Sequence, residues 1–302
     1  MPPLLVIAGA TATGKTALSL QLAEAIPGAE IISADSRQVY RGMDIGTAKV
    51  PVADRARVPH HGLDLVDPDQ PFSAADYQRT ARDALEQIAS RGGVAILVGG
   101  TGLYLRAVAR GFALEDTGHD PETRAELEER LSAEGISPLA NELRRLAPTV
   151  AATTDLANPR RVVRALERAR LHGDTPPPAP RGYPARQVWV GLQVDPSIHD
   201  SWIADRARAQ FTTGLIEEAA ALKERYDTDL RAFSAVGYRE SFAVLSGEMA
   251  RDEAIERTIT RTRQFARRQR TWFRAEPDVH WLDAASGSLP AALALAESVA
   301  AR

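Results

Sequence analysis

An eight-residue loop near the start of the chain, GATATGKT at residues 9–16, constrains the fold more than any other feature of the sequence. The apolar run LLVIA before it is typical of a buried strand, and the run ALSLQLAEAI after it is typical of a helix. A glycine-bounded loop that ends in Lys-Thr between a strand and a helix is the signature of a phosphate cradle. In such a loop several backbone N–H groups and the positive end of the helix dipole converge on one anion.

The loop therefore predicts a binding site for a di- or triphosphate with Mg²⁺. Lys15 supplies a mobile full charge, and the hydroxyl of Thr16 is placed to coordinate the metal. The predicted diphosphate-binding residues are Gly9, Ala10, Thr11, Ala12, Thr13, Gly14, Lys15 and Thr16. The loop alone leaves open whether its phosphate is transferred, hydrolysed or released as a leaving group.

Further strand-like runs alternate with helical stretches along the chain. They lie at residues 29–35, 94–100 and 187–194, and a helix is expected at about residues 74–91. Near-continuous apolar strands that alternate with helices are typical of a parallel sheet covered on both faces. We therefore expect an α/β fold with a P-loop NTPase-like parallel sheet flanked by helices, in which the second strand lies beside the first. Helices are expected from about residue 201 to the end.

A stretch of different character separates the third strand from the fourth. Residues 121–172 have the composition of helices alone, and the segment DTPPPAPRGYP at residues 174–184 carries five prolines in eleven residues. Such a proline-rich segment suits an extended linker. We expect a catalytic core made of residues 1–113 and 186–302 and an all-helical insertion domain at residues 114–185.

The ends of the second and third strands carry the next candidates. Asp35 ends the second strand, and parallel α/β sheets bind ligands at the carboxyl ends of their strands. Asp35 could hold Mg²⁺ through water, act as a general base, or only cap the following turn. The third strand ends in Gly99-Gly100-Thr101, where phosphate-loop NTPases commonly place a Mg²⁺-organising aspartate. Thr101 could donate to a bridging oxygen, which suits a departing diphosphate better than ATP hydrolysis.

Composition excludes several classes of protein. The net charge of −3 argues against a blanket non-specific nucleic-acid binder, although it allows a local basic groove. The chain has no cysteine, so a disulfide framework and a thiolate metal site are both excluded. No secretory signal and no run of about 20 apolar residues is present, so no membrane span is expected. We further expect the protein to be cytoplasmic and monomeric.

Two arginine-rich segments are candidates for RNA contact. Arg160, Arg164 and Arg168 recur every four residues behind a predicted N-cap at Asn158-Pro159, and Arg161 lies beside that face. Near the C-terminus a second stripe adjoins an apolar one, and it consists of Arg263, Arg267, Arg270 and Arg274. The alternative is that both are solvated faces partly paired with glutamates. His60 and His61 have no third ligand at suitable spacing, so a structural role is expected for them.

Several motifs, taken together and in order, resemble the bacterial tRNA dimethylallyltransferase family. Beside GATATGKT they are DSRQVYRGMDIGTAK, VPHH, FSAADY, VGGTGLYLRA, NPRRVVRALE, AVGYRE and TRQFARRQRTWFR. The resemblance implies transfer of the dimethylallyl group from dimethylallyl diphosphate to N6 of adenine 37 in tRNAs with adenines at 36 and 37. The partners would be the tRNA anticodon stem-loop and the allylic donor, with Mg²⁺ as cofactor and diphosphate as the leaving group.

The resemblance also implies roles for individual residues. Asp35 matches the family's general base, Thr101 a threonine near the bridging oxygen, and Arg206 an arginine assigned to the diphosphate. Family members often carry a second arginine four residues before Arg206, where this chain has Trp202. The implied tRNA-binding residues are Asp35, Ser36, Arg37, Gln38, Thr101, Arg160, Arg161 and Arg164.

Two other functions remain open from the residues alone. A phosphate loop with a helical insertion and arginines on mobile elements also suits a small-molecule or nucleotide kinase. A non-catalytic RNA-binding protein with a vestigial loop is the third interpretation.

Overall fold

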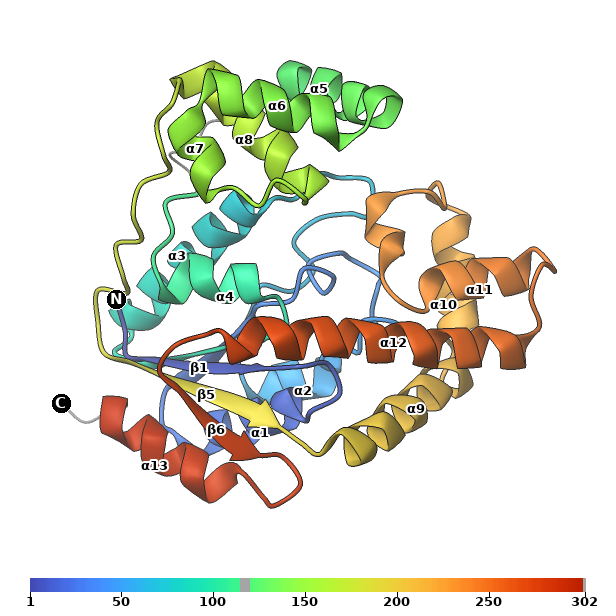
Figure 1. Cartoon of the computed structure of the whole chain (residues 1–302). Coiled ribbons are helices and arrows are strands. Elements are labelled where there is room, and N and C mark those ends of the chain that lie inside the picture. Colours follow the sequence, from blue (N-terminus) through green and yellow to red (C-terminus); the bar gives the residue numbers. More distant parts are fainter. Residues whose placement is uncertain (115–119, 301–302) are drawn as a thin grey trace. The chain divides into compact units, whose positions relative to one another are not determined.

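A computed structural model describes residues 1–114 and 120–300 of the chain, which divides into two compact units. The first unit consists of Met1–Gly111 and Gly182–Arg302, and the second is Phe112–Arg181. The first unit carries the sheet, and the second unit is helical (Figure 1). The insertion predicted at residues 114–185 overlaps the second unit.

Within the described residues, six parallel strands form one sheet in the order β3-β2-β4-β1-β5-β6. Their bounds are β1 (Leu4–Gly9), β2 (Ala29–Ser33), β3 (His60–His61), β4 (Val94–Gly99), β5 (Gln187–Gln193) and β6 (Val279–Asp283). The predicted parallel α/β fold is confirmed. The prediction that the second strand lies beside the first is wrong, because β4 is inserted between β1 and β2.

Both faces of the sheet are buried, which explains the nearly unbroken apolar runs of its central strands. Alternate residues of β1 point to opposite faces: Leu5 and Ile7 join one buried cluster, and Leu4 and Val6 join the other. The first cluster is closed by helices α1 (Lys15–Ala25) and α13 (Leu289–Ala300). The second is closed by α3 (Ala74–Ser90), α4 (Gly102–Ala109) and α12 (Arg251–Arg274). This sandwich fixes the strand ends that carry the candidate site.

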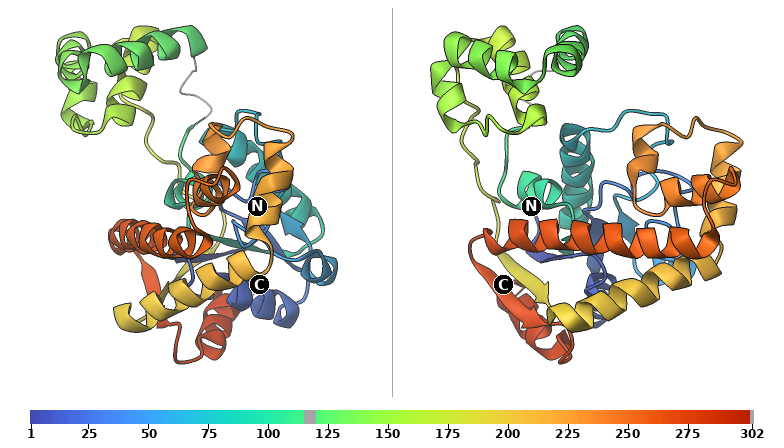
Figure 2. Two further views of the ribbon diagram at one scale, coloured as in Figure 1. Left: turned by 90° about the vertical axis from the view of Figure 1, so that its right-hand side faces the viewer. Right: turned by 45° about the vertical axis from the view of Figure 1, so that its right-hand side comes forward.

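The C-terminal part of the first unit is not made of helices alone, contrary to the sequence prediction. Strand β6 pairs with the edge of β5 between α12 and α13. The helix that follows β5 is α9, and it begins at Pro196, earlier than the predicted residue 201. Asp195 caps this helix by accepting a hydrogen bond from Ser197 N–H at 2.8 Å. The remaining elements of this unit are α2 (Val52–Arg57), α9 (Pro196–Thr212), α10 (Leu215–Lys223), the 3₁₀ turn η2 (Arg231–Ser234) and α11 (Tyr238–Leu245). Helix α9 packs against α12 (Figure 2).

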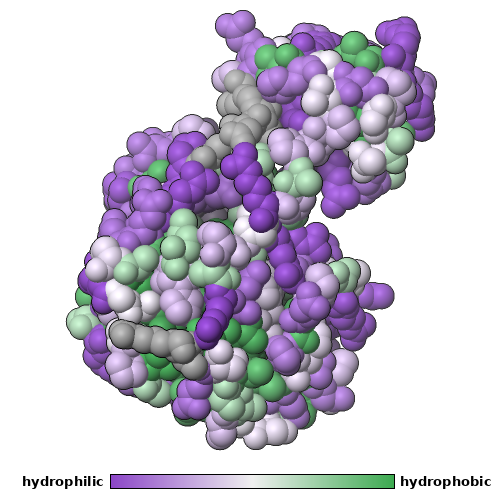
Figure 3. Space-filling view, turned by 90° about the vertical axis from the view of Figure 1, so that its left-hand side faces the viewer, coloured by the Kyte–Doolittle hydropathy of each residue, from purple (hydrophilic) through white to green (hydrophobic). Residues whose placement is uncertain are grey.

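The helical unit has a hydrophobic core of its own. It consists of α5 (Pro121–Glu134), α6 (Ile136–Leu146), α7 (Pro148–Thr153) and α8 (Pro159–His172). The four helices enclose a cluster that includes Leu127, Leu143 and Leu166. The fully buried Glu167 carboxylate accepts hydrogen bonds from Arg124, at 2.8 Å, and from Arg164, at 2.7 Å. The outer surface of these helices is mostly hydrophilic on the face in Figure 3.

Candidate active site

The phosphate loop leaves β1 and turns directly into the first turn of α1. Gly14, the residue before the helix, has a φ of 81°, a left-handed conformation that glycine adopts without strain. Ala12 has a φ of 60°, which is unusual for a residue with a Cβ atom. The Thr13 hydroxyl donates to Ala10 O at 2.9 Å, and Lys15 Nζ donates to the same carbonyl at 2.5 Å. The loop is therefore curled around Lys15.

Three charged side chains meet above this loop. Loss of hydration on burial and repulsion from the Arg206 guanidinium lower the pKa of Lys15 to about 7, against partial compensation from the Asp35 carboxylate. Burial also lowers the pKa of Arg206. Asp35 follows β2, Lys15 lies in the phosphate loop at the start of α1, and Arg206 comes from α9. Two basic side chains beside one carboxylate suit a bound anion, which would favour the charged form of Lys15.

The end of β4 joins the end of β2 at the same edge. The Thr101 hydroxyl accepts a hydrogen bond from Ser36 N–H at 3.0 Å and donates to Ser36 Oγ at 3.3 Å. Asp35 Oδ1 accepts from the N–H of Arg37 at 2.8 Å, which forms a local turn that aims the carboxylate. The structure thus brings together the three predicted catalytic residues Asp35, Thr101 and Arg206 with the phosphate loop.

Arg37 and Gln38, predicted to contact tRNA, also hold the backbone of this segment. Arg37 donates to Arg231 O at 2.8 Å and to Ser234 Oγ at 2.8 Å. Gln38 donates to Thr47 O at 3.2 Å and accepts from Ser33 Oγ at 2.9 Å. Their polar groups therefore fix the loop that carries Asp35.

The rest of the DSRQVYRGMDIGTAK motif is held by two charged side chains, the half-buried Glu218 and the fully buried Lys49. The carboxylate of Glu218, on α10, accepts from the N–H groups of Asp44, Ile45 and Gly46 at 2.7–3.1 Å. The side chain of Lys49 is fully buried and pairs with Asp44 and Asp64 at 2.7 and 2.6 Å. These bonds fix the backbone of residues 44–46 and give Asp44 and Lys49 of the motif a structural role.

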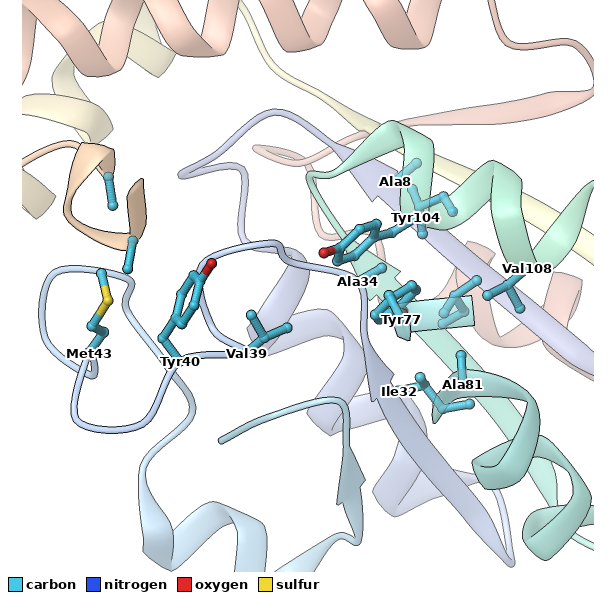
Figure 4. Packing of buried hydrophobic residues seen from close by; sticks show 14 of the residues in the cluster. Ala8, Ile32, Ala34, Val39, Tyr40, Met43, Tyr77, Ala81, Tyr104 and Val108 are labelled. Carbon is cyan, nitrogen blue, oxygen red and sulfur yellow. The ribbon is translucent and has the colours of Figure 1, made fainter. Parts of the chain in front are cut away.

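Two stacked tyrosines form an apolar wall next to this segment. The rings of Tyr77 and Tyr104 are parallel to within 7°, with centroids 3.9 Å apart. In Figure 4 they lie next to Ala34, the residue before Asp35. Burial raises the pKa of Tyr104, so its hydroxyl stays protonated at neutral pH.

Two residues of this site escaped the sequence prediction. His199 on α9 and Gln269 on α12 both bind the phosphate loop at Thr11. Their signal was present in the sequence, since both are polar residues on otherwise apolar helix stripes. His199 shares its stripe with Ile203, and Gln269 shares its stripe with Ala266 and Phe273.

The predicted RNA-contacting arginines of the helical unit differ in their surroundings. Arg160 and Arg161 are exposed in the first turn of α8, behind an Asn158 cap that accepts from Arg161 N–H. Arg164 is tied to Glu167, and Arg168 is half-buried. Arg161 also pairs with the exposed Asp155 at 3.6 Å. The arginine face is therefore most exposed at its N-terminal end, at Arg160 and Arg161.

The C-terminal arginine stripe lies on α12. Arg263, Arg267 and Arg274 are exposed, whereas Arg270 donates to His199 Nδ1 at 2.8 Å. The adjoining apolar stripe predicted from the sequence consists of Ile255, Ile259, Ala266 and Phe273. The last three are buried, and Ile255 is half-buried.

A divalent cation has one predicted ligand in the chain. The Thr16 side chain is exposed in the first turn of α1, and no partner binds its hydroxyl in residues 1–114 and 120–300. Across the same residues, no group of three His, Cys, Asp or Glu side chains could hold a metal ion. His61 pairs with Glu30 at 2.7 Å, and His60 Nδ1 lies 2.7 Å from Val58 O. The site suits a metal bound largely by water and ligand oxygens, as Mg²⁺ often is.

The described helices include none that is long and apolar enough to cross a lipid bilayer.

Comparison with known proteins supplies the family. The chain is 45% identical over 302 residues to the tRNA dimethylallyltransferase of Salinispora arenicola, covering 98% of this chain and 86% of that protein. It is 38% identical to the crystal structure of the full-length tRNA isopentenylpyrophosphate transferase from Bacillus halodurans, with a TM-score of 0.73 and coverage of 99% and 96%. A eukaryotic dimethylallyltransferase acting on tRNA superimposes with a TM-score of 0.76 at 26% identity, over 94% of this chain and 74% of the other. The sequence profile described as IPP transferase matches residues 38–276, and the chain belongs to that family.

Proposed function

We propose that this protein transfers the dimethylallyl group of dimethylallyl diphosphate to N6 of adenine 37 in tRNAs that carry adenines at 36 and 37. The products are N6-(dimethylallyl)adenosine and diphosphate. The observation that carries the proposal is the meeting of Lys15, Arg206 and Asp35 above the phosphate loop, with Thr101 at the neighbouring strand end. A cation-rich cradle beside a single carboxylate suits an allylic diphosphate attacked by a neutral amine.

The chemistry assigns one task to each group. The N6 amine is a weak nucleophile, because its lone pair is delocalised into the adenine ring. As N6 forms a bond to the allylic carbon, the bond from that carbon to the diphosphate oxygen breaks, and the N6 proton passes to the Asp35 carboxylate. Negative charge grows on the departing diphosphate, and we assign its stabilisation to Lys15, Arg206 and the loop amides. We assign to Thr101 a hydrogen bond to the bridging oxygen, for which its hydroxyl must turn away from Ser36 Oγ.

Mg²⁺ fits this site through Thr16. Its free hydroxyl and the oxygens of the donor are the ligand types that Mg²⁺ prefers, with water completing the shell. A bound metal would neutralise part of the diphosphate charge.

The tRNA is proposed to bind through Arg160 and Arg161, with Ser36 and Thr101 near the displaced base. Bases of an anticodon loop are already unpaired, so moving one out of its stack costs less than in a duplex. A tRNA substrate also suits a cytoplasmic location, and we expect the enzyme to act as a monomer.

The test uses two tRNAs that differ only in the exocyclic group of the base at position 37. Labelled dimethylallyl diphosphate and Mg²⁺ should label an unmodified tRNA with adenines at 36 and 37. The same tRNA with inosine at 37 lacks the exocyclic amine and should stay unlabelled. Labelling of both would place the acceptor elsewhere. Consumption of ATP with nucleoside monophosphates, and no use of the allylic donor, would favour a kinase, whereas tRNA binding without reaction of either donor would favour a non-catalytic RNA-binding protein.

A further inference from the structure

Every polar group of one phosphate-loop residue is held by helices from the distant C-terminal part of the chain. Thr11 N–H donates to Gln269 Oε1 at 2.8 Å, and Thr11 O lies 2.8 Å from His199 Nε2. The Thr11 hydroxyl accepts from Arg206 Nη1 at 3.1 Å. His199 and Arg206 come from α9, and Gln269 comes from α12. Side chains from two helices therefore bind the loop at the single residue Thr11.

The Gln269 carboxamide bridges two loops of the site. While its oxygen accepts from Thr11, its nitrogen donates to Gly100 O at 2.8 Å. Gly100 leaves the room that this requires, because a Cβ atom there would collide with Gln269 Nε2. Gln269 is only 7% exposed, so loss of either hydrogen bond would leave a nearly buried polar group without its protein partner. Besides the pairing of β1 with β4, Gln269 therefore links the phosphate loop directly to the strand end that carries Thr101.

His199 is fixed in a single protonation state by its two partners. The Thr11 carbonyl can only accept, so Nε2 carries the proton, and Nδ1 accepts from Arg270 at 2.8 Å. The side chain is fully buried, and burial lowers the pKa of His199, as does the Arg270 guanidinium. The imidazole is therefore neutral and locked in orientation.

We propose that Gln269 and His199 are positioning residues, which hold Thr11 so that the amides after it and the Thr101 hydroxyl face one point before the donor arrives. They touch neither donor nor tRNA in this role. Because the N–H and the carbonyl of Thr11 are both held, the next residue, Ala12, is kept at its φ of 60°. Fixing donors in advance spares the binding energy that ordering the loop would cost. The inference rests on the proposed function and concerns the same site.

The first test changes one atom of Gln269. Gln269→Glu keeps the oxygen that accepts from Thr11 but replaces the donor to Gly100 O with a second oxygen. Affinity for inorganic diphosphate with Mg²⁺, measured by titration calorimetry, should fall about 10- to 100-fold. The affinity for tRNA should stay within about twofold, since no predicted phosphate contact is lost. Donor kcat/KM should fall while the KM for tRNA is unchanged.

The matched control is Gln264→Glu, an exposed glutamine on the same helix that receives the same charge. It should leave the diphosphate affinity within about twofold of the wild type. If Gln269→Glu also stays within that range with an unchanged thermal midpoint, the inference is overturned. Should Gln269→Glu fail to fold, Gln269→Asn decides by the same criteria, because its shorter side chain cannot span both loops.

The second test separates the hydrogen bond of His199 from its bulk. His199→Gln can place an amide N–H near the position of Nε2, whereas His199→Leu cannot donate at all. His199→Gln should retain most of the diphosphate affinity, and His199→Leu should lose about tenfold. Equal affinities in these two variants would contradict the role of His199. A wild type that binds neither diphosphate nor the allylic donor would instead refute the proposed function.

Discussion

Lys15 gives the site a pH dependence that can be worked out in advance. Its pKa in the free protein is about 7, below the ordinary 10.5, because burial and Arg206 disfavour the charged form. A bound diphosphate favours the ammonium form and raises this pKa. Between pH 7 and the raised value, Lys15 is neutral before binding and charged afterwards, so binding takes up a proton. Below about pH 6 the lysine is charged in both states, and no proton is taken up.

The size of the effect follows from the same pKa. At pH 8 a group with a pKa of about 7 is about 90% neutral, so Lys15 should contribute about 0.9 proton on binding. At pH 6 the contribution should be about 0.1 proton. Because binding requires Lys15 to gain this proton, the affinity for diphosphate should fall about tenfold between pH 6 and pH 8.

The assay is titration calorimetry of inorganic diphosphate with Mg²⁺, in two buffers of different ionisation enthalpy. The ligand also titrates, so Lys15→Arg serves as the matched control, since arginine stays charged throughout. The difference between wild type and Lys15→Arg is the contribution of Lys15. Equal proton uptake by both proteins at pH 8 would refute the argument. Arg206→Gln removes a repulsive neighbour and should move the transition to higher pH.

Three further predictions concern catalysis, RNA binding and stability. Asp35→Asn keeps the local turn but removes the base, so turnover should fall about 10²- to 10⁴-fold in single-turnover assays, with the dissociation constant for tRNA nearly unchanged; a parallel loss of binding would contradict this. Arg160→Ala with Arg161→Ala should weaken tRNA binding and make the slope of log K against log salt shallower by about 1–2; an unchanged slope would remove both residues from the interface. Glu167→Gln leaves Arg124 and Arg164 without their buried carboxylate, so urea unfolding should show a loss of about 3 kcal/mol, whereas the exposed Glu128→Gln should change little.

The sequence identified the central strands because burial on both faces leaves a plain signal. β1, β2, β4 and β5 are continuous apolar runs, and each was predicted within two residues of its observed bounds. The edge strands gave no such signal: β3 has two residues, and β6 has exposed residues at His280 and Asp283. Strand order depends on how each crossover helix packs, so the place of β4 between β1 and β2 could not be derived from the runs alone.

The candidate site shows the same division. Asp35, Thr101 and Lys15 could be predicted because they follow strands or belong to a local motif. Gln269 and His199 could not, because each acts on a loop more than 180 residues away. What marks them is a polar residue at a core position of a helix, and burial of such a residue requires partners that only the tertiary structure shows.

The helical unit leaves and rejoins the rest of the chain at one place. Gly182 N–H donates to Arg110 O at 3.0 Å, so the chain segments before residue 112 and after residue 181 lie next to each other. The buried clusters of the sheet are built from residues outside this segment, and the segment encloses its own. A chain in which a short turn joins residue 111 to residue 182 should therefore still fold and bind diphosphate. On the proposed role of Arg160 and Arg161, it should bind tRNA more weakly than the full chain.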